Sequence, residues 1–444
     1  MSALNLQQAI DQAGSPMRLL WKPNSPGWTP PVLPDEYVGW AQEQKASDET
    51  VAMADLSHHM TDLFVEGPDA LRLLSDYSAN GYDNFVVGQA KQFVPVTQEG
   101  YLVMDGILLR AAEEKFVLTG QGAAHNWIGY QAERNRYDVS FRLDPPTPFR
   151  GGRDPILFRY QIQGPRAHAL VEEVFGGPLP KIKFFHSALV TLSGRTFRAL
   201  RHGMSGQPGY EFIGDWEYGA YVRDTFLRVG DAYGLVQVGA KTYGTNNIDS
   251  GWVAAPTPAI FTAAELRDYR EHLPAHSSEG KIPINGSYFS ENIEDYYVNP
   301  FELGYGRFLT FDRDFHGRDG LMRMKENVHT AKVTVVLDRA DVDKVFGPDL
   351  GYLSTSARHR IEVNGQLIGS TNSTAHLAPY GTVVALALIE DRYAAPGTRV
   401  DFVWGEHPGP GTNPEAIAEF PRLRGTVQPA PYNEFARRGY RKNV

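Results

Sequence analysis

The feature that most constrains the fold is a strand–turn–helix unit that occurs twice, roughly a hundred residues apart. Residues 63–68 (LFVEGP) lead into a helical pattern at 69–74, and residues 160–165 (YQIQGP) lead into another at 167–174. In each unit a short alternating strand ends at glycine, and proline opens the helix, where its missing N–H costs nothing. The repeat predicts two similar α+β halves packed side by side.

Further strands are indicated by short alternating segments around these helices. They lie at 93–95, 101–104, 107–110 and 116–119 in the first half, and at 188–192, 196–200 and 210–212 in the second. A helix is predicted over 216–233, ended by Gly234.

Beyond residue 328 the pattern changes to strands alone, at 332–337, 361–363, 366–369, 383–389 and 399–403. Asn364-Gly365 marks a tight hairpin turn between two of them. At ~150 residues per domain, the 444-residue chain has room for three. We predict α+β domains at 1–150 and 151–327 and an all-β barrel or sandwich at 328–444. The second includes a Pro- and Gly-rich connection over 255–300, with one helix at 263–272.

Composition removes several classes of function. The chain has no cysteine, which excludes disulfides, thiolate nucleophiles and Cys-based metal sites. A net charge of −9 argues against a nucleic-acid partner. The longest apolar run, 383–389, is far short of the ~20 residues of a membrane span, and residues 1–15 do not resemble a signal peptide. We therefore expect a cytoplasmic protein without a membrane partner, and the oligomeric state stays open.

The C-terminal tail is locally basic, and we expect it to be a solvated tail or a subunit contact. Its charged residues are Arg437, Arg438, Arg441 and Lys442.

Known catalytic motifs are absent. The thirteen histidines include no His-Glu-x-x-His, and the neighbours His58 and His59 would point to opposite faces of a strand, so we predict no metal. No Gly-x-Ser-x-Gly elbow, phosphate loop or dinucleotide fingerprint occurs. What remains is a set of aromatic and amide residues at strand ends, a mixture that suits a flat heteroaromatic ligand but also suits core packing.

Two segments carry a resemblance to a known family. Residues 201–211 (RHGMSGQPGYE) resemble the pterin-binding segment of the glycine-cleavage T-protein family, and 299–306 with 311–318 match its second signature. The chain is more closely similar to bacterial tetrahydrofolate-dependent aryl O-demethylases acting on vanillate and syringate. The shared segments are 57–60, 90–97, 158–165, 183–185, 200–204, 250–252 and 293–300.

The resemblance implies the three-domain cloverleaf of the T-protein, with tetrahydrofolate in a central channel. It implies pterin contacts at Gln161, Phe184, Glu211 and Trp252. It further places Tyr243 between folate and methyl ether, and His59, followed by Met60, near the substrate.

One departure from the demethylases affects the substrate. Their arginine for the substrate carboxylate is replaced here by Gln121, and glutamine cannot replace a full charge. Either the substrate lacks that carboxylate, or another cation holds it, for which Arg110 and His125 are the candidates. A substrate-side tyrosine of those enzymes aligns with Pro30, and the T-protein's catalytic aspartate aligns near Asp105 without a secure assignment.

The resulting hypothesis is methyl transfer from a methoxylated aromatic compound to N5 of tetrahydrofolate, giving 5-methyltetrahydrofolate and a phenol. Tyr243 would donate to the leaving oxygen, with His59 orienting its ring or relaying the proton, unless Tyr243 only packs against the pterin. The alternatives are a sulfonium, methylated-amine or lipoyl-bound donor, a non-enzymatic folate-binding protein, and a structural or carbohydrate-binding module. The folate-binding proteins carry a Lys-Gly-Cys motif that a cysteine-free chain lacks.

Overall fold

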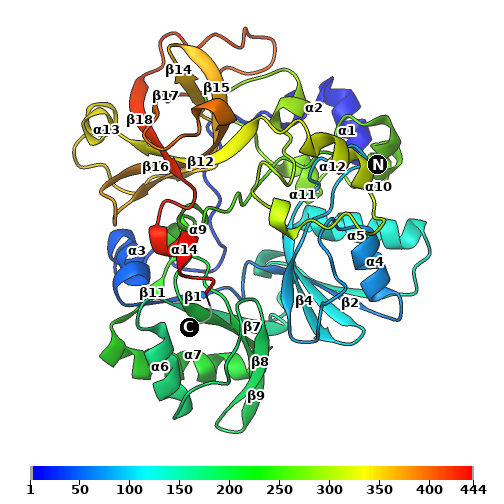
Figure 1. The fold of residues 1–444 in the computed structure, drawn as a ribbon, viewed down its shortest axis with the longest axis vertical. Coiled ribbons are helices and arrows are strands. Elements are labelled where there is room, and N and C mark those ends of the chain that lie inside the picture. The colour runs from blue at the N-terminus through cyan, green and yellow to red at the C-terminus, as the bar shows by residue number, and fades with distance from the viewer. Residues whose placement is uncertain (1–3, 443–444) are drawn as a thin grey trace.

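Three β-sheets build three lobes around a common centre in the computed structural model, which describes residues 4–442 (Figure 1). Helices pack on two of the sheets, and the third sheet closes into a barrel. The predicted α+β class, with two mixed halves and a C-terminal β-barrel, is therefore confirmed.

The first lobe is an antiparallel sheet. Its strands are β2 (Thr61–Glu66), β3 (Ala90–Phe93), β4 (Gly106–Ala112), β5 (Lys115–Gly120) and β6 (Ser140–Asp144). They run in the order β3-β4-β5-β2-β6. Helices α4 (Ala70–Asp76) and α5 (Gly122–Arg134) bury Leu73, Leu74 and Ile128 in the core of this lobe.

The second lobe is a mixed sheet. Its strands are β1 (Val51–Asp55), β7 (Leu157–Gln163), β8 (Ser187–Leu192), β9 (Arg195–Arg201), β10 (Gly209–Asp215) and β11 (Leu235–Val238). They run in the order β11-β1-β7-β10-β9-β8, and helices α6 (Ala167–Phe175) and α7 (Trp216–Gly230) pack on the sheet. Strand β1 comes from the segment 1–150, so the two predicted α+β segments share this sheet.

The repeated glycines show why the unit recurs. Gly67 and Gly164 both have a positive φ, +142° and +132°. A Cβ on Gly67 would lie 2.4 Å from the carbonyl oxygen of Asp138, and one on Gly164 would lie 2.4 Å from that of Thr50. Each oxygen belongs to the chain entering a neighbouring antiparallel strand, β6 or β1. Glycine is required at both positions by its conformation and by this close approach.

The third lobe settles the choice between barrel and sandwich. Its strands are β12 (Thr330–Leu337), β13 (Ser354–Thr355), β14 (Arg360–Val363), β15 (Gln366–Leu377), β16 (Thr382–Glu390), β17 (Arg399–Val403) and β18 (Arg422–Pro429). Six of them form a closed ring because β15 pairs with both β14 and β16, and β13 pairs with β15. Helix α13 (Arg339–Phe346) contacts β16 and β18 and buries Val342 in the core of the barrel. Strands β13 and β18 were not predicted.

The remaining helices join the lobes. They are α1 (Leu6–Ala13), α2 (Pro16–Leu20), α3 (Trp40–Glu49), α8 (Ala240–Tyr243), α9 (Asn246–Ser250), α10 (Arg267–His272), α11 (Ser278–Lys281), α12 (Arg318–Lys325) and α14 (Glu434–Arg438). The connection over 255–300 is a packed layer, in which Tyr269 meets Leu6 and Met17 in one apolar cluster.

The strand predicted at 101–104 is wrong. Val103 and Met104 are buried in two different apolar clusters, and Leu102 makes only an isolated bridge with Val96. The alternation that suggested a strand therefore reflects packing rather than sheet pairing.

Within residues 4–442, no helix is long and apolar enough to cross a membrane. The same residues include no group of three or more His, Asp or Glu side chains placed to hold a metal ion.

Three buried histidines predict acid sensitivity. Burial lowers the pKa of His59 and His359 to about 3 and that of His125 to about 4. The unfolded chain binds these protons near pH ~6.5, so the free energy of unfolding falls as pH drops from there toward 4, by about 1.4 kcal/mol per pH unit for each histidine. Urea unfolding at several pH values measures this fall.

His359→Phe is the informative variant because that ring packs on Phe402 and Trp404. We expect this variant to reduce the slope of the free energy of unfolding against pH by the contribution of one histidine, about 1.4 kcal/mol per pH unit. An unchanged dependence would contradict the assignment.

Candidate active site

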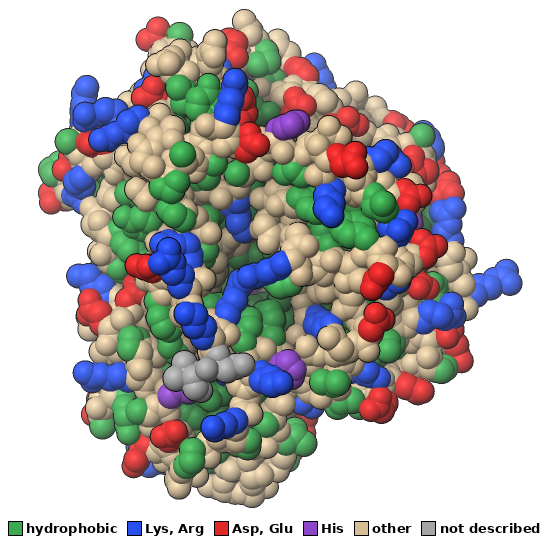
Figure 2. All heavy atoms as spheres, in the orientation of Figure 1, with side chains coloured by type: hydrophobic (Ala, Val, Ile, Leu, Met, Phe, Trp, Pro, Cys, Tyr) green, Lys and Arg blue, Asp and Glu red, His purple; other side chains and the backbone are tan. Residues whose placement is uncertain are grey.

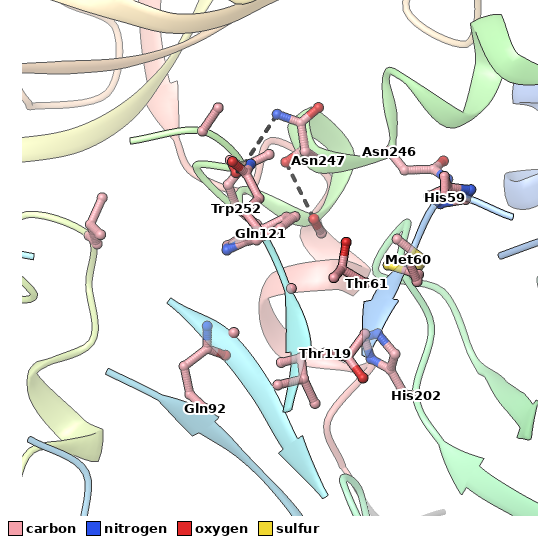
Figure 3. A pocket seen from close by; sticks show the side chains of 18 of the residues that line it. His59, Met60, Thr61, Gln92, Thr119, Gln121, His202, Asn246, Asn247 and Trp252 are labelled. Carbon is pink, nitrogen blue, oxygen red and sulfur yellow. Dashed lines mark hydrogen bonds between the residues drawn. The ribbon is translucent and has the colours of Figure 1, made fainter. Parts of the chain in front are cut away.

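A single large cavity of about 2130 Å³ lies where the three lobes meet, and each lobe contributes to its wall. Figure 3 shows that side chains from β5, the β1–β2 loop and the α8–α9 region surround one space. Figure 2 shows the corresponding hollow, with Lys and Arg side chains gathered around it. The resemblance placed a ligand channel here.

Tyr243 and His59 meet in an aromatic cluster on this wall. Their ring centroids are 4.4 Å apart, and Trp28 makes edge contacts with both, at 6.2 and 5.8 Å. Trp28 is 61% exposed, although it lines the cavity beside two buried rings. Trp28 was not predicted from the sequence, because nothing in the spacing of residues links it to Tyr243, more than two hundred positions away.

Burial keeps both residues of this pair uncharged. It raises the pKa of Tyr243 well above that of a free tyrosine, and the nearby Glu211 adds to the effect. It lowers the pKa of His59 to about 3, and neither ring nitrogen of His59 has a hydrogen-bond partner within residues 4–442. At neutral pH Tyr243 is therefore a hydroxyl donor, and His59 is a neutral imidazole.

A short anchor fixes Tyr243. The Ala240 N–H donates to Pro34 O at 2.9 Å, and the Tyr243 N–H donates to Gly239 O at 3.0 Å. A Cβ on Gly239 would lie 2.4 Å from Asp35 O, so only glycine allows the strap over 34–36 to pass this closely.

Glu211 is held by a buried ion network. Arg159 on β7 donates to both oxygens of Asp62 on β2 at 3.0 Å and also donates to Glu211 on β10. The Thr119 hydroxyl donates to Asp62 at 2.5 Å. This network spans two lobes and leaves Glu211 as an acceptor in the cavity wall. Neither Arg159 nor Asp62 was predicted from the sequence.

The other predicted pterin contacts divide into two groups. Phe184 and Trp252 line the cavity, and Phe184 stacks on Phe185 with centroids 4.5 Å apart. Gln161 is fully buried and does not line it. Its amide donates to His202 O at 2.7 Å and to Tyr210 O at 3.0 Å, so it positions the segment 202–210 from behind.

Asp105 is the centre of a second polar cluster. Its Oδ2 accepts from Gln92 Nε2 at 2.5 Å, Trp252 Nε1 at 3.0 Å and Tyr305 Oη at 2.6 Å, and all three donors line the cavity. Burial raises the pKa of Asp105, while these donors oppose the rise. Asp105 therefore fixes the indole of Trp252 in the wall.

The predicted substrate contacts also divide. Gln121 and Met60 line the cavity, and the Gln121 amide donates to Ala254 O at 2.5 Å. Arg110 lies outside it, paired with Glu113 at 2.7 Å. His125 also lies outside, bonded to Leu118 O at 3.0 Å beside a separate hollow of about 490 Å³. The geometry therefore corrects the expectation that Arg110 or His125 holds a substrate carboxylate.

Comparisons with known proteins agree with this fold. The chain matches the GCVT N-terminal domain family over residues 24–257. The crystal structure of the glycine cleavage system aminomethyltransferase T from Bartonella henselae superposes with a TM-score of 0.63, covering 90% of this chain and 92% of that one at 16% identity. The chain belongs to the GCVT family, the family of the glycine-cleavage T-protein.

Among its relatives, the chain is 35% identical to syringate O-demethylase from Sphingobium sp. (strain NBRC 103272 / SYK-6), over 99% of this chain and 98% of that one. It is 25% identical to sesamin methylene transferase from Sinomonas sp. (strain No.22), over 90% of each. An aminomethyltransferase from Symbiobacterium thermophilum is also 25% identical, over 85% of this chain and 88% of that one.

The ion network predicts a large stability effect. Arg159→Met leaves Asp62 and Glu211 buried without their cation, and we expect a loss of ~3–5 kcal/mol in the free energy of unfolding. The control is Arg72→Met, since Arg72 is 57% exposed in its pair with Asp69 and should cost under ~1 kcal/mol. Urea unfolding at pH 7 measures both. If Arg159→Met lowered the free energy of unfolding no more than Arg72→Met does, the prediction would be wrong.

Proposed function

We propose that the protein is a tetrahydrofolate-dependent O-demethylase that moves a methyl group from a methoxylated aromatic compound to N5 of tetrahydrofolate. The observation that carries this proposal is the position of the Tyr243 hydroxyl. It is kept protonated by burial, packs on His59 and lines the same cavity as Glu211, Phe184 and Trp252. The full-length similarity to a syringate O-demethylase supports the aromatic donor.

The cavity has the donors, acceptors and rings that a folate requires. Glu211 offers a carboxylate to the N–H edge of a pterin, and Phe184 and Trp252 offer apolar surface to its faces. When bound, the folate supplies N5 as the methyl acceptor. A volume of about 2130 Å³ leaves room for an arene beside it.

In the overall reaction the bond between the aryl oxygen and the methyl carbon breaks, and a bond from that carbon to N5 forms. The proton lost from N5 balances the one gained by the phenol oxygen. Tyr243 meets the leaving oxygen with its hydroxyl, which offsets the charge that develops there. A wall that held the two reactants in line would lower the barrier by several kcal/mol.

His59 orients Tyr243 rather than supplying a charged acid. A pKa of about 3 leaves the imidazole neutral at pH 7, and its ring edge packs against Tyr243 at 4.4 Å. Of the two roles considered for His59, the geometry favours orientation.

Three neutral amides in the cavity wall also bear on the substrate. They belong to Gln121, Asn246 and Asn247, and the buried Asn246 Nδ2 has no partner within residues 4–442. These amides suit a methyl-donating arene that carries hydrogen-bond acceptors, and they do not require that arene to carry a carboxylate. A cytoplasmic location, a small-molecule donor and no nucleic-acid partner belong to the proposal, which leaves the oligomeric state open.

The methyl transfer itself can be tested directly. Purified protein with tetrahydrofolate and a panel of methoxyarenes should produce 5-methyltetrahydrofolate and the matching phenol, detected by mass spectrometry. Because Gln121 lacks a positive charge, donors with and without a carboxylate should react at comparable rates, and Gln121→Arg should shift the preference toward carboxylated donors. If 5-methyltetrahydrofolate formed only from a sulfonium or a methylated amine, the proposed aryl methyl donor would be wrong.

Tyr243→Phe tests the mechanism. Without the hydroxyl the phenoxide leaves unassisted, and we expect kcat to fall by ~10²–10⁴-fold while the Kd of folate changes little. Single-turnover kinetics and equilibrium binding measure the two quantities. Near-normal turnover in a correctly folded variant would reduce Tyr243 to a packing residue.

A further inference from the structure

The basic C-terminal residues belong to an arm that is built into the fold. The arm, defined as residues 430–442, leaves the barrel after β18 and reaches the second lobe, where α14 lies between the two in Figure 1. Arg201 Nη2 donates to Lys442 O at 2.7 Å, and Tyr440 Oη lies 3.2 Å from His202 Nδ1. The expectation of a solvated tail is therefore wrong, and that of a subunit contact stays a prediction.

Close packing holds the arm in place. Gly206 has a φ of +76°, and a Cβ there would lie 2.6 Å from Cβ of Ala436. Gly251 faces Pro431 in the same way, with a Cβ position 2.9 Å from the proline nitrogen. Gly206 in the second lobe and Gly251, directly before Trp252, thus leave space for the arm.

The arm forms part of the cavity wall beside Phe184. Arg437, Tyr440 and Arg441 all line the cavity. The Tyr440 ring meets Phe184 edge-on with centroids 4.9 Å apart, and the Arg441 guanidinium carbon lies 5.9 Å from the Phe184 centroid. In contrast, Arg438 pairs with Glu434 at 2.9 Å and does not line the cavity.

The charge of the wall opposes the charge of the chain. The chain carries −9, but eight Lys and Arg line the cavity against three Asp and Glu. Arg159 is neutralised inside the wall, whereas no ion pair to Arg437 or Arg441 is found in the part of the chain that the structure describes. A concave surface concentrates such a field, and guanidinium groups match carboxylates in shape as well as charge.

The residues of the cavity wall differ in depth from the buried Glu211 to the exposed arm. Glu211, the proposed pterin acceptor, is 5% exposed, Phe184 is half-buried, and Arg441 is exposed. A ligand whose heterocycle reaches Glu211 therefore directs its other end toward the arm. No hydrogen bond or ring contact joins the arm to His59, Tyr243 or Trp28 within residues 4–442, so it serves the cofactor end rather than the donor end.

We propose that this arm is an anion-binding clasp, in which Arg437 and Arg441 bind the carboxylates of the glutamyl tail of the folate. The clasp favours folates with several linked glutamates, because each adds a carboxylate within reach of the basic wall. This inference rests on the proposed function for the identity of the heterocycle.

The test compares two double variants that each remove two positive charges from the arm. Arg437→Gln with Arg441→Gln removes the lining pair, and Arg438→Gln with Lys442→Gln removes two that do not line the cavity. Dissociation constants for tetrahydrofolate with one and with three glutamates are measured by calorimetry, without a methyl donor, at low and high salt. Circular dichroism and thermal melting check that each variant is folded.

We expect the wild type and the control pair to bind the triglutamate ~10-fold or more tightly than the monoglutamate at low salt, with a smaller ratio at high salt. The lining pair should lose most of that ratio. Equal triglutamate-to-monoglutamate ratios in the two double variants would overturn the clasp.

The outcome is separable from that of the proposed function. If methyl transfer occurs but the Arg437→Gln, Arg441→Gln variant keeps the wild-type ratio of triglutamate to monoglutamate affinity, the clasp is wrong and the proposed function stands. Arm-dependent binding of triglutamate without transfer from any arene would keep the clasp and reject the aryl donor.

Discussion

The site depends on one buried guanidinium. Arg159 joins Asp62 of the first lobe to Glu211 of the second, and all three side chains are nearly inaccessible to solvent. Two carboxylates at such a depth require a cation with several donors in fixed directions, which arginine provides and lysine does not. The network therefore fixes the junction of the lobes and, at the same place, leaves Glu211 as an anionic acceptor in the cavity wall.

That junction follows from the repeat. In each half a strand ends at a glycine whose backbone lies against the chain entering a neighbouring strand, and the helix begins after proline. Asp62 on β2 and Arg159 on β7 belong to the corresponding strands of the two units. The repeated strands thus meet through their polar residues at the cavity, while their apolar residues point into two separate cores.

The sequence predicted what depends on neighbours along the chain. Most strands, the long helix α7 and the Gly–Pro junctions were found from alternation and turn residues. It could not show that Gln161 lies behind the wall, because a fully buried amide and a ligand contact look alike in a strand. Asp105 meets Tyr305 across 200 positions, and His202 meets Tyr440 across 238, distances at which spacing carries no information. Only the folded chain shows that Arg110 and His125 are directed away from the site.

The distribution of charge also distinguishes the candidate reactions. At the donor end Tyr243 and His59 are both neutral, and Arg159 is fully compensated. A neutral ether and a neutral amine that exchange a methyl group create a phenoxide and an ammonium, and a buried wall opposes that separation unless a proton donor meets the oxygen. A sulfonium donor would only move a positive charge from sulfur to nitrogen and would need no hydroxyl. The aromatic rings of Trp28 and Tyr243 could accommodate either donor. The protonated hydroxyl of Tyr243, a residue that lines the cavity, is the feature that only the ether requires.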